Sequence, residues 1–100
     1  MHEKLMELSR KLKKEFKVEE VIVFGSYARG DFKEDSDIDI LIVVNDEKIE
    51  NDVRKVAYSF IPEIGRLISV KVIDKKTFEN MKRMKFSLIV SIEKEGIKIG

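Results

Sequence analysis

Residues 37–44 read Asp-Ile-Asp-Ile-Leu-Ile-Val-Val and give the clearest strand signal in the chain. Side chains alternate along a strand, so the three isoleucines share one face, while Asp37 and Asp39 lie on the other. Strands disfavour aspartate, and two carboxylates on one face of an apolar strand therefore indicate a functional site. The alternative is a half-exposed strand with a polar outer face.

The segment Phe24-Gly25-Ser26-Tyr27-Ala28-Arg29-Gly30 precedes this strand and follows a short apolar run. Gly25 ends that run and lets an anion approach the backbone closely. Ser26 offers a hydroxyl and a backbone N–H where a turn or helix begins, a common place for phosphate, and Arg29 can reach the same phosphate. An ordinary turn and a solvated arginine are the alternatives.

The two aspartates add a metal to this interpretation. Asp37 and Asp39 are two residues apart, which places their carboxylates about 7 Å apart along one face of the strand. Mg²⁺ prefers oxygen ligands and is bound by one or two carboxylates together with substrate phosphates. The combined pattern predicts a site for a metal ion and a nucleotide.

The remaining apolar spacing predicts a small sheet covered by helices. Pro62 ends or bends one of these helices, Asp74 caps the next, which can break near 85–87, and Gly96 stops it. The expected elements are helices over 3–16, 47–60 and 75–95, and strands over 20–24, 37–44, 67–73 and 97–99. Their order predicts an α/β (α+β) fold with a small mixed β-sheet flanked by helices, in a single domain over 1–100.

Composition excludes several classes of protein. Charged residues make up 39% of the chain, but the net charge is only +1, which argues against strong nucleic-acid binding. The absence of cysteine excludes disulfides and thiol catalysis, and the apolar runs are far shorter than the ~20 residues that span a membrane. We therefore expect a cytoplasmic protein. The Lys- and Glu-rich composition without Gln indicates a thermophile, or simply a highly charged surface.

Gly25-Ser26, Arg29-Gly30 and Ser36-Asp37-Ile38-Asp39 together resemble the signature of the minimal nucleotidyltransferases, small members of the DNA polymerase β-like superfamily. The resemblance implies a mixed sheet, a nucleoside triphosphate such as ATP bound with Mg²⁺, and transfer of its nucleoside monophosphate to an acceptor hydroxyl. Gly25, Ser26 and Arg29 would bind the triphosphate, and Asp37 and Asp39 would be the catalytic, metal-binding carboxylates. It also implies a small helical partner protein of the HEPN type, as in toxin–antitoxin modules. A homodimer is the alternative assembly.

One feature departs from this family. The superfamily has a third carboxylate on a later strand, but residues 67–73 contain no acidic side chain. Glu63 lies before this strand and Asp74 follows it as the expected helix cap. The alternative function is therefore a non-catalytic, antitoxin-like binding module of the same fold.

The other candidate residues have simpler interpretations. His2, the single histidine, is given no role. The basic residues Lys82, Arg83 and Lys85 fit a solvated helix face better than a binding surface. Tyr27 either lines the nucleotide site or packs beside Phe24.

Overall fold

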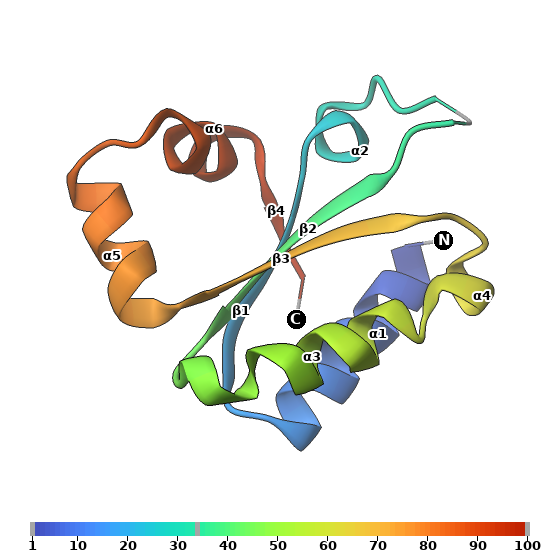
Figure 1. Cartoon of the computed structure of the whole chain (residues 1–100). Coiled ribbons are helices and arrows are strands. Elements are labelled where there is room, and N and C mark those ends of the chain that lie inside the picture. The colour runs from blue at the N-terminus through green and yellow to red at the C-terminus, as the bar shows by residue number, and fades with distance from the viewer. Residues whose placement is uncertain (1, 34, 100) are drawn as a thin grey trace.

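The computed structural model describes residues 2–33 and 35–99, and its centre is a four-stranded mixed sheet (Figure 1). β1 pairs antiparallel with β2 and with β4, whereas β2 and β3 are parallel. The spatial order is β3-β2-β1-β4, and the strands are β1 (Val18–Phe24), β2 (Ile38–Val44), β3 (Ile68–Asp74) and β4 (Ile97–Lys98). The predicted mixed sheet flanked by helices is confirmed.

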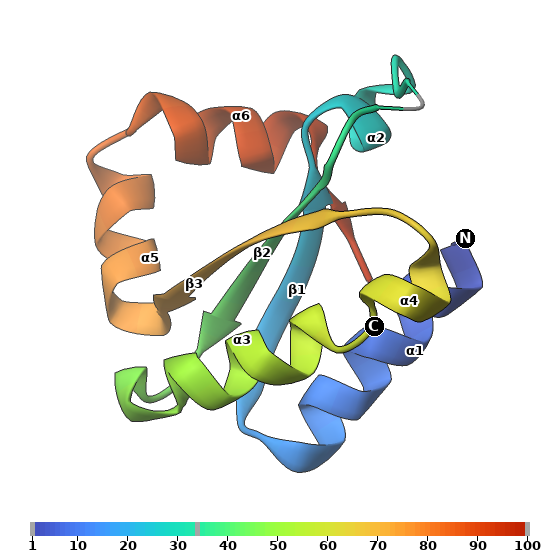
Figure 2. The same cartoon turned by 45° about the vertical axis from the view of Figure 1, so that its right-hand side comes forward.

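Helices cover both faces of the sheet (Figure 2). One face carries α1 (His2–Glu15), α3 (Glu50–Tyr58) and α4 (Ile61–Ile64). The other face carries α5 (Lys75–Arg83) and α6 (Ser87–Glu95). The four-residue helix α2 (Ser26–Arg29) follows β1 directly, and the 3-10 turn η1 (Glu47–Ile49) precedes α3. Within the described residues, no helix is both long enough and apolar enough to cross a membrane.

β2 is buried on both faces because it lies between β1 and β3 and under a layer of helices on each side. Its isoleucines are 0% exposed and pack with the α1 leucines and with α3. Leu41 and Val43 pack instead with Phe78 of α5 and with α6. The predicted alternation is confirmed, and it places Asp39, two residues before Leu41, on the α5–α6 side of the sheet.

Two predicted helices are divided in the structure. The helix expected over 47–60 ends at Tyr58, and Pro62 lies in the first turn of the separate helix α4, where its missing N–H leaves no bond unmade. The helix expected from Lys75 is divided at Lys85, whose φ of 56° does not continue a right-handed helix.

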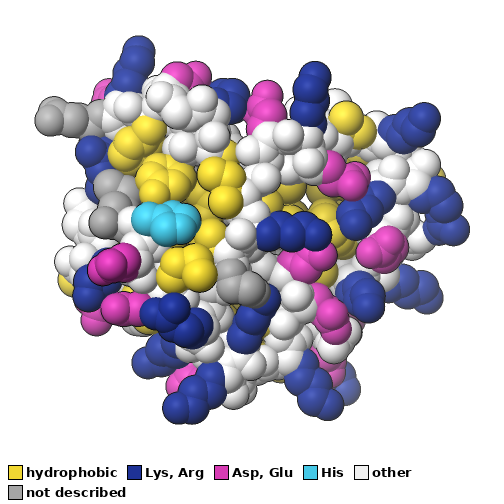
Figure 3. Space-filling view, turned by 180° about the vertical axis from the view of Figure 1, so that it is seen from behind, with side chains coloured by type: hydrophobic (Ala, Val, Ile, Leu, Met, Phe, Trp, Pro, Cys, Tyr) yellow, Lys and Arg dark blue, Asp and Glu magenta, His cyan; other side chains and the backbone are white. Residues whose placement is uncertain are grey.

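The surface carries both signs of charge. Seen from behind, Lys and Arg side chains alternate with Asp and Glu, around a group of exposed hydrophobic side chains (Figure 3). This mixture agrees with the nearly balanced composition.

Asp74 caps α5, as predicted. Its carboxylate accepts hydrogen bonds from the Thr77 N–H at 3.1 Å and the Thr77 hydroxyl at 2.5 Å. The bond from that hydroxyl, followed by the one from the N–H, lowers the pKa of Asp74 below its ordinary 3.8.

We expect Asp74→Ala to lower the melting temperature by several degrees at neutral pH, because the first turn of α5 loses its cap. A lowered pKa in the folded state stabilises the fold above the ordinary carboxyl value, and this contribution is lost as the pH falls through the folded value. Thermal melts should therefore show the two proteins converging below pH 3.8. Asp74→Asn, which keeps a capping oxygen, is the matched control, and a wild-type melting temperature for Asp74→Ala at neutral pH would contradict the assignment.

Candidate functional site

β1 ends at a turn that only glycine forms readily. Gly25 has φ of 75° and ψ of −151°, a region from which other residues are essentially absent. A Cβ added to Gly25 would lie 2.3 Å from Oδ2 of Asp39, so the carboxylate already occupies the space that a side chain would need. The two halves of the predicted motif, Gly25 and Asp39, are therefore in direct contact.

α2 begins at Ser26, immediately after this turn. The sequence predicted that a turn or helix begins at Ser26, but it did not distinguish the two, because a four-residue helix is too short for a periodic signal. The N–H groups in the first turn of a helix have no intrahelical acceptor. The half-buried Ser26 thus stands at a position suited to phosphate oxygens.

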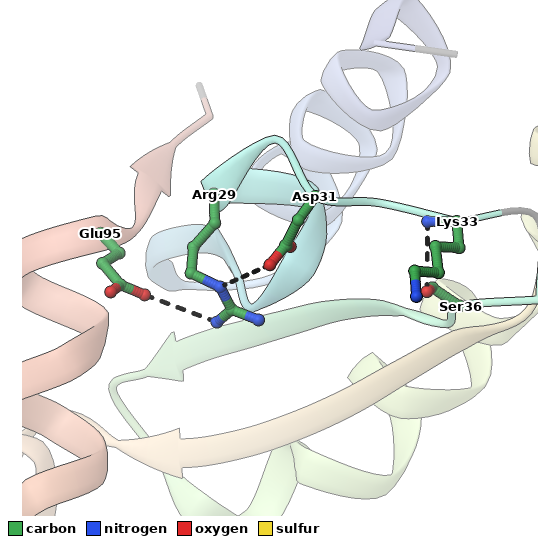
Figure 4. Close-up of polar contacts among 5 residues, drawn as sticks. All are labelled: Arg29, Asp31, Lys33, Ser36 and Glu95. Carbon is green, nitrogen blue, oxygen red and sulfur yellow. Dashed lines mark hydrogen bonds and ion pairs between the residues drawn. The ribbon is translucent and has the colours of Figure 1, made fainter.

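The loop after α2 is held by aromatic and basic side chains. Tyr27 packs edge-to-face on Phe32, with ring centres 5.4 Å apart. The predicted packing beside Phe24 is not found, because Phe24 belongs to the hydrophobic cluster on the other face of the sheet. The Arg66 guanidinium lies 4.3 Å from the centre of the Phe32 ring and donates to the Lys33 carbonyl at 3.1 Å. The Lys33 N–H donates to the Ser36 hydroxyl at 3.3 Å, just before Asp37 (Figure 4).

The two predicted carboxylates lie at the start of β2. Asp37 is exposed and immediately precedes the strand, and the half-buried Asp39 pairs with Phe24 at the end of β1. Gly25, Ser26, Asp37 and Asp39 therefore lie together where β1 ends and β2 begins, at one end of the two central strands.

Electrostatics at Asp39 favour a bound cation. Burial, and next the neighbouring charge of Asp37, raise the pKa of the Asp39 carboxyl above its ordinary 3.8. Lys71 on β3 and Arg29 on α2 oppose this rise. The ionised carboxylate is therefore destabilised in the folded chain, and a cation would relieve both the burial and the repulsion.

Removing this charge should stabilise the ligand-free fold. A carboxyl whose pKa is raised on folding contributes to the stability of the fold at low pH. This contribution is lost as the pH rises through the pKa of the folded state. We expect Asp39→Asn to raise the melting temperature by a few degrees at pH 7, with the gain vanishing below the ordinary value of 3.8. Differential scanning calorimetry at both pH values measures this, with the exposed Asp35→Asn as control. A lower melting temperature at pH 7 would contradict the cause given for the raised pKa.

Arg29 joins α2 to α6 (Figure 4). Its guanidinium lies 3.4 Å from a carboxylate oxygen of Asp31 and 3.5 Å from one of Glu95, the last residue of α6. The charge of Asp31 is the main cause that raises the pKa of Arg29, and Glu95 contributes less. In this structure Arg29 is thus paired with two acids rather than open to phosphate, and Glu95 is a site residue that the sequence did not reveal.

The third carboxylate remains absent from the described residues, which contain no group of three acidic or other ligating side chains suited to a metal. Asp74 pairs with Val44, five residues from Asp39 along β2 and thus about 17 Å away. Glu63 is exposed on α4, which packs on the opposite face of the sheet. Asp37 and Asp39 could hold a divalent metal ion together with substrate phosphates, since Mg²⁺ sites commonly have only one or two protein carboxylates.

The basic residues at the end of α5 form a separate surface. A hollow of about 870 Å³ over α5 is lined by Lys82 and Arg83 but also by Glu79 and Glu93. Lys82 pairs with Glu79 at 3.7 Å and lies over the Phe78 ring. These contacts agree with the predicted solvated helix face.

Comparison with known proteins identifies the family. The model of the nucleotidyltransferase domain matches residues 5–99. The chain belongs to this family. The matched residues include Gly25, Ser26, Asp37 and Asp39.

Two relatives are described as acting on proteins. The nucleotidyltransferase domain is 35% identical to the "Putative protein adenylyltransferase MJ0141" of Methanocaldococcus jannaschii, over 95% of this chain and 98% of that one. It is 58% identical to the protein adenylyltransferase MntA of Thermococcus cleftensis over 33 residues, 33% of each chain.

The fold is also found in a crystal structure of a toxin–antitoxin with AMP-PNP. The TM-score is 0.62 at 22% identity, over 96% of this chain and 69% of that chain.

Proposed function

We propose that this nucleotidyltransferase domain binds ATP with Mg²⁺ and transfers AMP to a hydroxyl of a partner protein. The observation that carries the proposal is the contact between Gly25 and the Asp39 carboxylate, which joins a phosphate-binding turn to a metal-binding carboxylate. A protein acceptor is supported by the relatives described as protein adenylyltransferases.

Each site residue has a role in this reaction. The Gly25–Ser26 turn binds the triphosphate, and Asp37 and Asp39 hold the Mg²⁺. When bound, the ion neutralises phosphate charge and makes the α-phosphorus more electrophilic. The acceptor oxygen loses its proton to solvent water and bonds to the α-phosphorus, the bond from that phosphorus to the bridging oxygen breaks, and pyrophosphate leaves with the electron pair of that bond. The turn and the two aspartates accelerate this in-line attack by holding the α-phosphate in position.

Of the predicted phosphate ligands, Arg29 is the one that would have to change its contacts most on binding the nucleotide. To bind a phosphate, its guanidinium would have to release Asp31 or Glu95, which now lie within 3.5 Å. If Glu95 is the partner released, a link between α2 and α6 is lost, and nucleotide binding is then coupled to the position of α6.

The acceptor is proposed to be a small helical protein of the HEPN type. This assignment is supported by the fold shared with a chain of a toxin–antitoxin structure that contains AMP-PNP. The proposal needs no nucleic acid and no membrane.

A second candidate function follows from the missing acid. The described residues lack a third ligating carboxylate, and loss of a general base typically costs about 10²–10⁴ in rate. A chain with this defect would bind its partner and the nucleotide but transfer AMP too slowly for transfer to be its function.

One assay separates the two functions. The chain is incubated with Mg²⁺ and the protein encoded next to it, using ATP labelled on the α-phosphate in one reaction and on the γ-phosphate in the other. Adenylyl transfer predicts label on the partner from α-labelled ATP alone. Stable binding of the partner with no label from either nucleotide would instead support the binding module.

A further inference from the structure

Lys71 lies on the same face of the sheet as Asp39. In the parallel pair, Asp39 is opposite Ser69 and Leu41 is opposite Lys71, and side chains two residues apart share a face. Ile73 continues this row and packs with the cluster that contains Leu41. Ser69 and Lys71 therefore lie beside Asp39 on the β3 side.

This part of the face is open to solvent. Ser69 is half-buried and Lys71 is exposed, whereas Val70 between them is buried against the opposite helical layer. Among the ion pairs of the described residues, none within 4.0 Å involves Lys71. The parallel register and this exposure together place a solvent-facing lysine beside Asp39.

We propose that Lys71 binds the nucleotide phosphates beside Asp39. Its ammonium supplies the positive charge that a second divalent cation would otherwise bring, so the site binds a single divalent cation. This inference rests on the proposed function and deepens it. A lysine ammonium is a compact point charge and a common phosphate ligand. It also opposes a second divalent cation at the same place by direct repulsion.

Charge balance supports the exchange. A lysine in place of an acidic side chain makes the site more positive by two elementary charges, which is the charge of one Mg²⁺. Lys71, the two aspartates and one Mg²⁺ together leave a site of charge +1 facing the triphosphate, because Arg29 is balanced by Asp31 and Glu95. A site with an acid at 71 would need a second divalent ion to reach the same charge.

The test counts bound metal ions. Wild-type chain is titrated with Mn²⁺ in the presence of α,β-methylene-ATP, and bound Mn²⁺ is counted by electron paramagnetic resonance while calorimetry gives the nucleotide affinity. We expect one Mn²⁺ per chain. Lys71→Met should weaken nucleotide binding roughly tenfold to a hundredfold, and Lys71→Asp should bind a second Mn²⁺. Lys55→Met, on α3 at the opposite face, is the matched control.

The outcomes distinguish the two proposals. A wild-type chain that binds no nucleotide would overturn both. Two Mn²⁺ ions in the wild-type complex, an unchanged affinity in Lys71→Met, or no second ion in Lys71→Asp would overturn the role of Lys71 and leave the proposed transferase intact. Lys71 is exposed, so circular dichroism should show all these variants folded.

Discussion

Asp39→Asn is expected to reduce AMP transfer by roughly two to four orders of magnitude, while the protein itself becomes more stable. The half-buried carboxylate is destabilised in the ligand-free fold by burial and by Asp37. A destabilised carboxylate at this position is typical of a functional site, and binding a cation would offset its cost. An amide keeps the shape of the side chain but removes the charge that would hold Mg²⁺.

The measurement is the initial rate of label transfer from α-labelled ATP, compared with melting temperatures of the same samples. Asp35→Asn, in the exposed turn before the strand, should leave both unchanged. Full transfer activity in Asp39→Asn would show that the carboxylate is not part of the reaction. A parallel fall in activity and stability would indicate a structural role instead.

Gly25→Ala is expected to be the most damaging change to both fold and site. The backbone at Gly25 has positive φ with ψ of −151°, and the new Cβ would meet Asp39 Oδ2 at 2.3 Å. Such a backbone costs about 1–3 kcal/mol for a residue with a side chain, before the displaced carboxylate is counted. Chemical denaturation should show a loss of about 2–4 kcal/mol, with transfer activity lost even in the folded fraction.

Gly65→Ala provides the matched control. Gly65 also has positive φ, at 78°, but no atom lies within 4 Å of its added Cβ. Its cost should therefore be smaller. In an Asp39→Ala background, the effect of Gly25→Ala should also shrink, because the contact is gone. Equal losses at both glycines, and no coupling to Asp39, would contradict the packing of this turn against the carboxylate.

The core of the site was predictable because it depends on local signals. The alternation over 37–44 fixes which side chains share a face, and the glycine after β1 marks a backbone that other residues avoid. The register of β1 and β2 then brings Gly25 to Asp39 through pairing of Phe24 with Asp39.

The rest of the site depends on contacts between distant segments. Glu95 reaches Arg29 only because α6 packs on the face of the sheet next to α2, and no spacing in the sequence encodes this ion pair. Lys71 becomes a neighbour of Asp39 only through the parallel register of β2 and β3. In the sequence it is a single lysine in an apolar strand. The only expectation stated for that strand was that it lacks an acidic residue.

Nucleotide binding at the Gly25–Asp39 contact is measured most directly by the amide NMR spectrum of the ¹⁵N-labelled chain during titration with Mg²⁺ and α,β-methylene-ATP. The largest shifts are expected at Gly25, Ser26 and 37–39, with smaller ones at Lys71 and Glu95, and Asp39→Asn should abolish them. Shifts confined to the basic surface of α5, or a spectrum that does not change at saturating ligand, would contradict a nucleotide site at the Gly25–Asp39 contact.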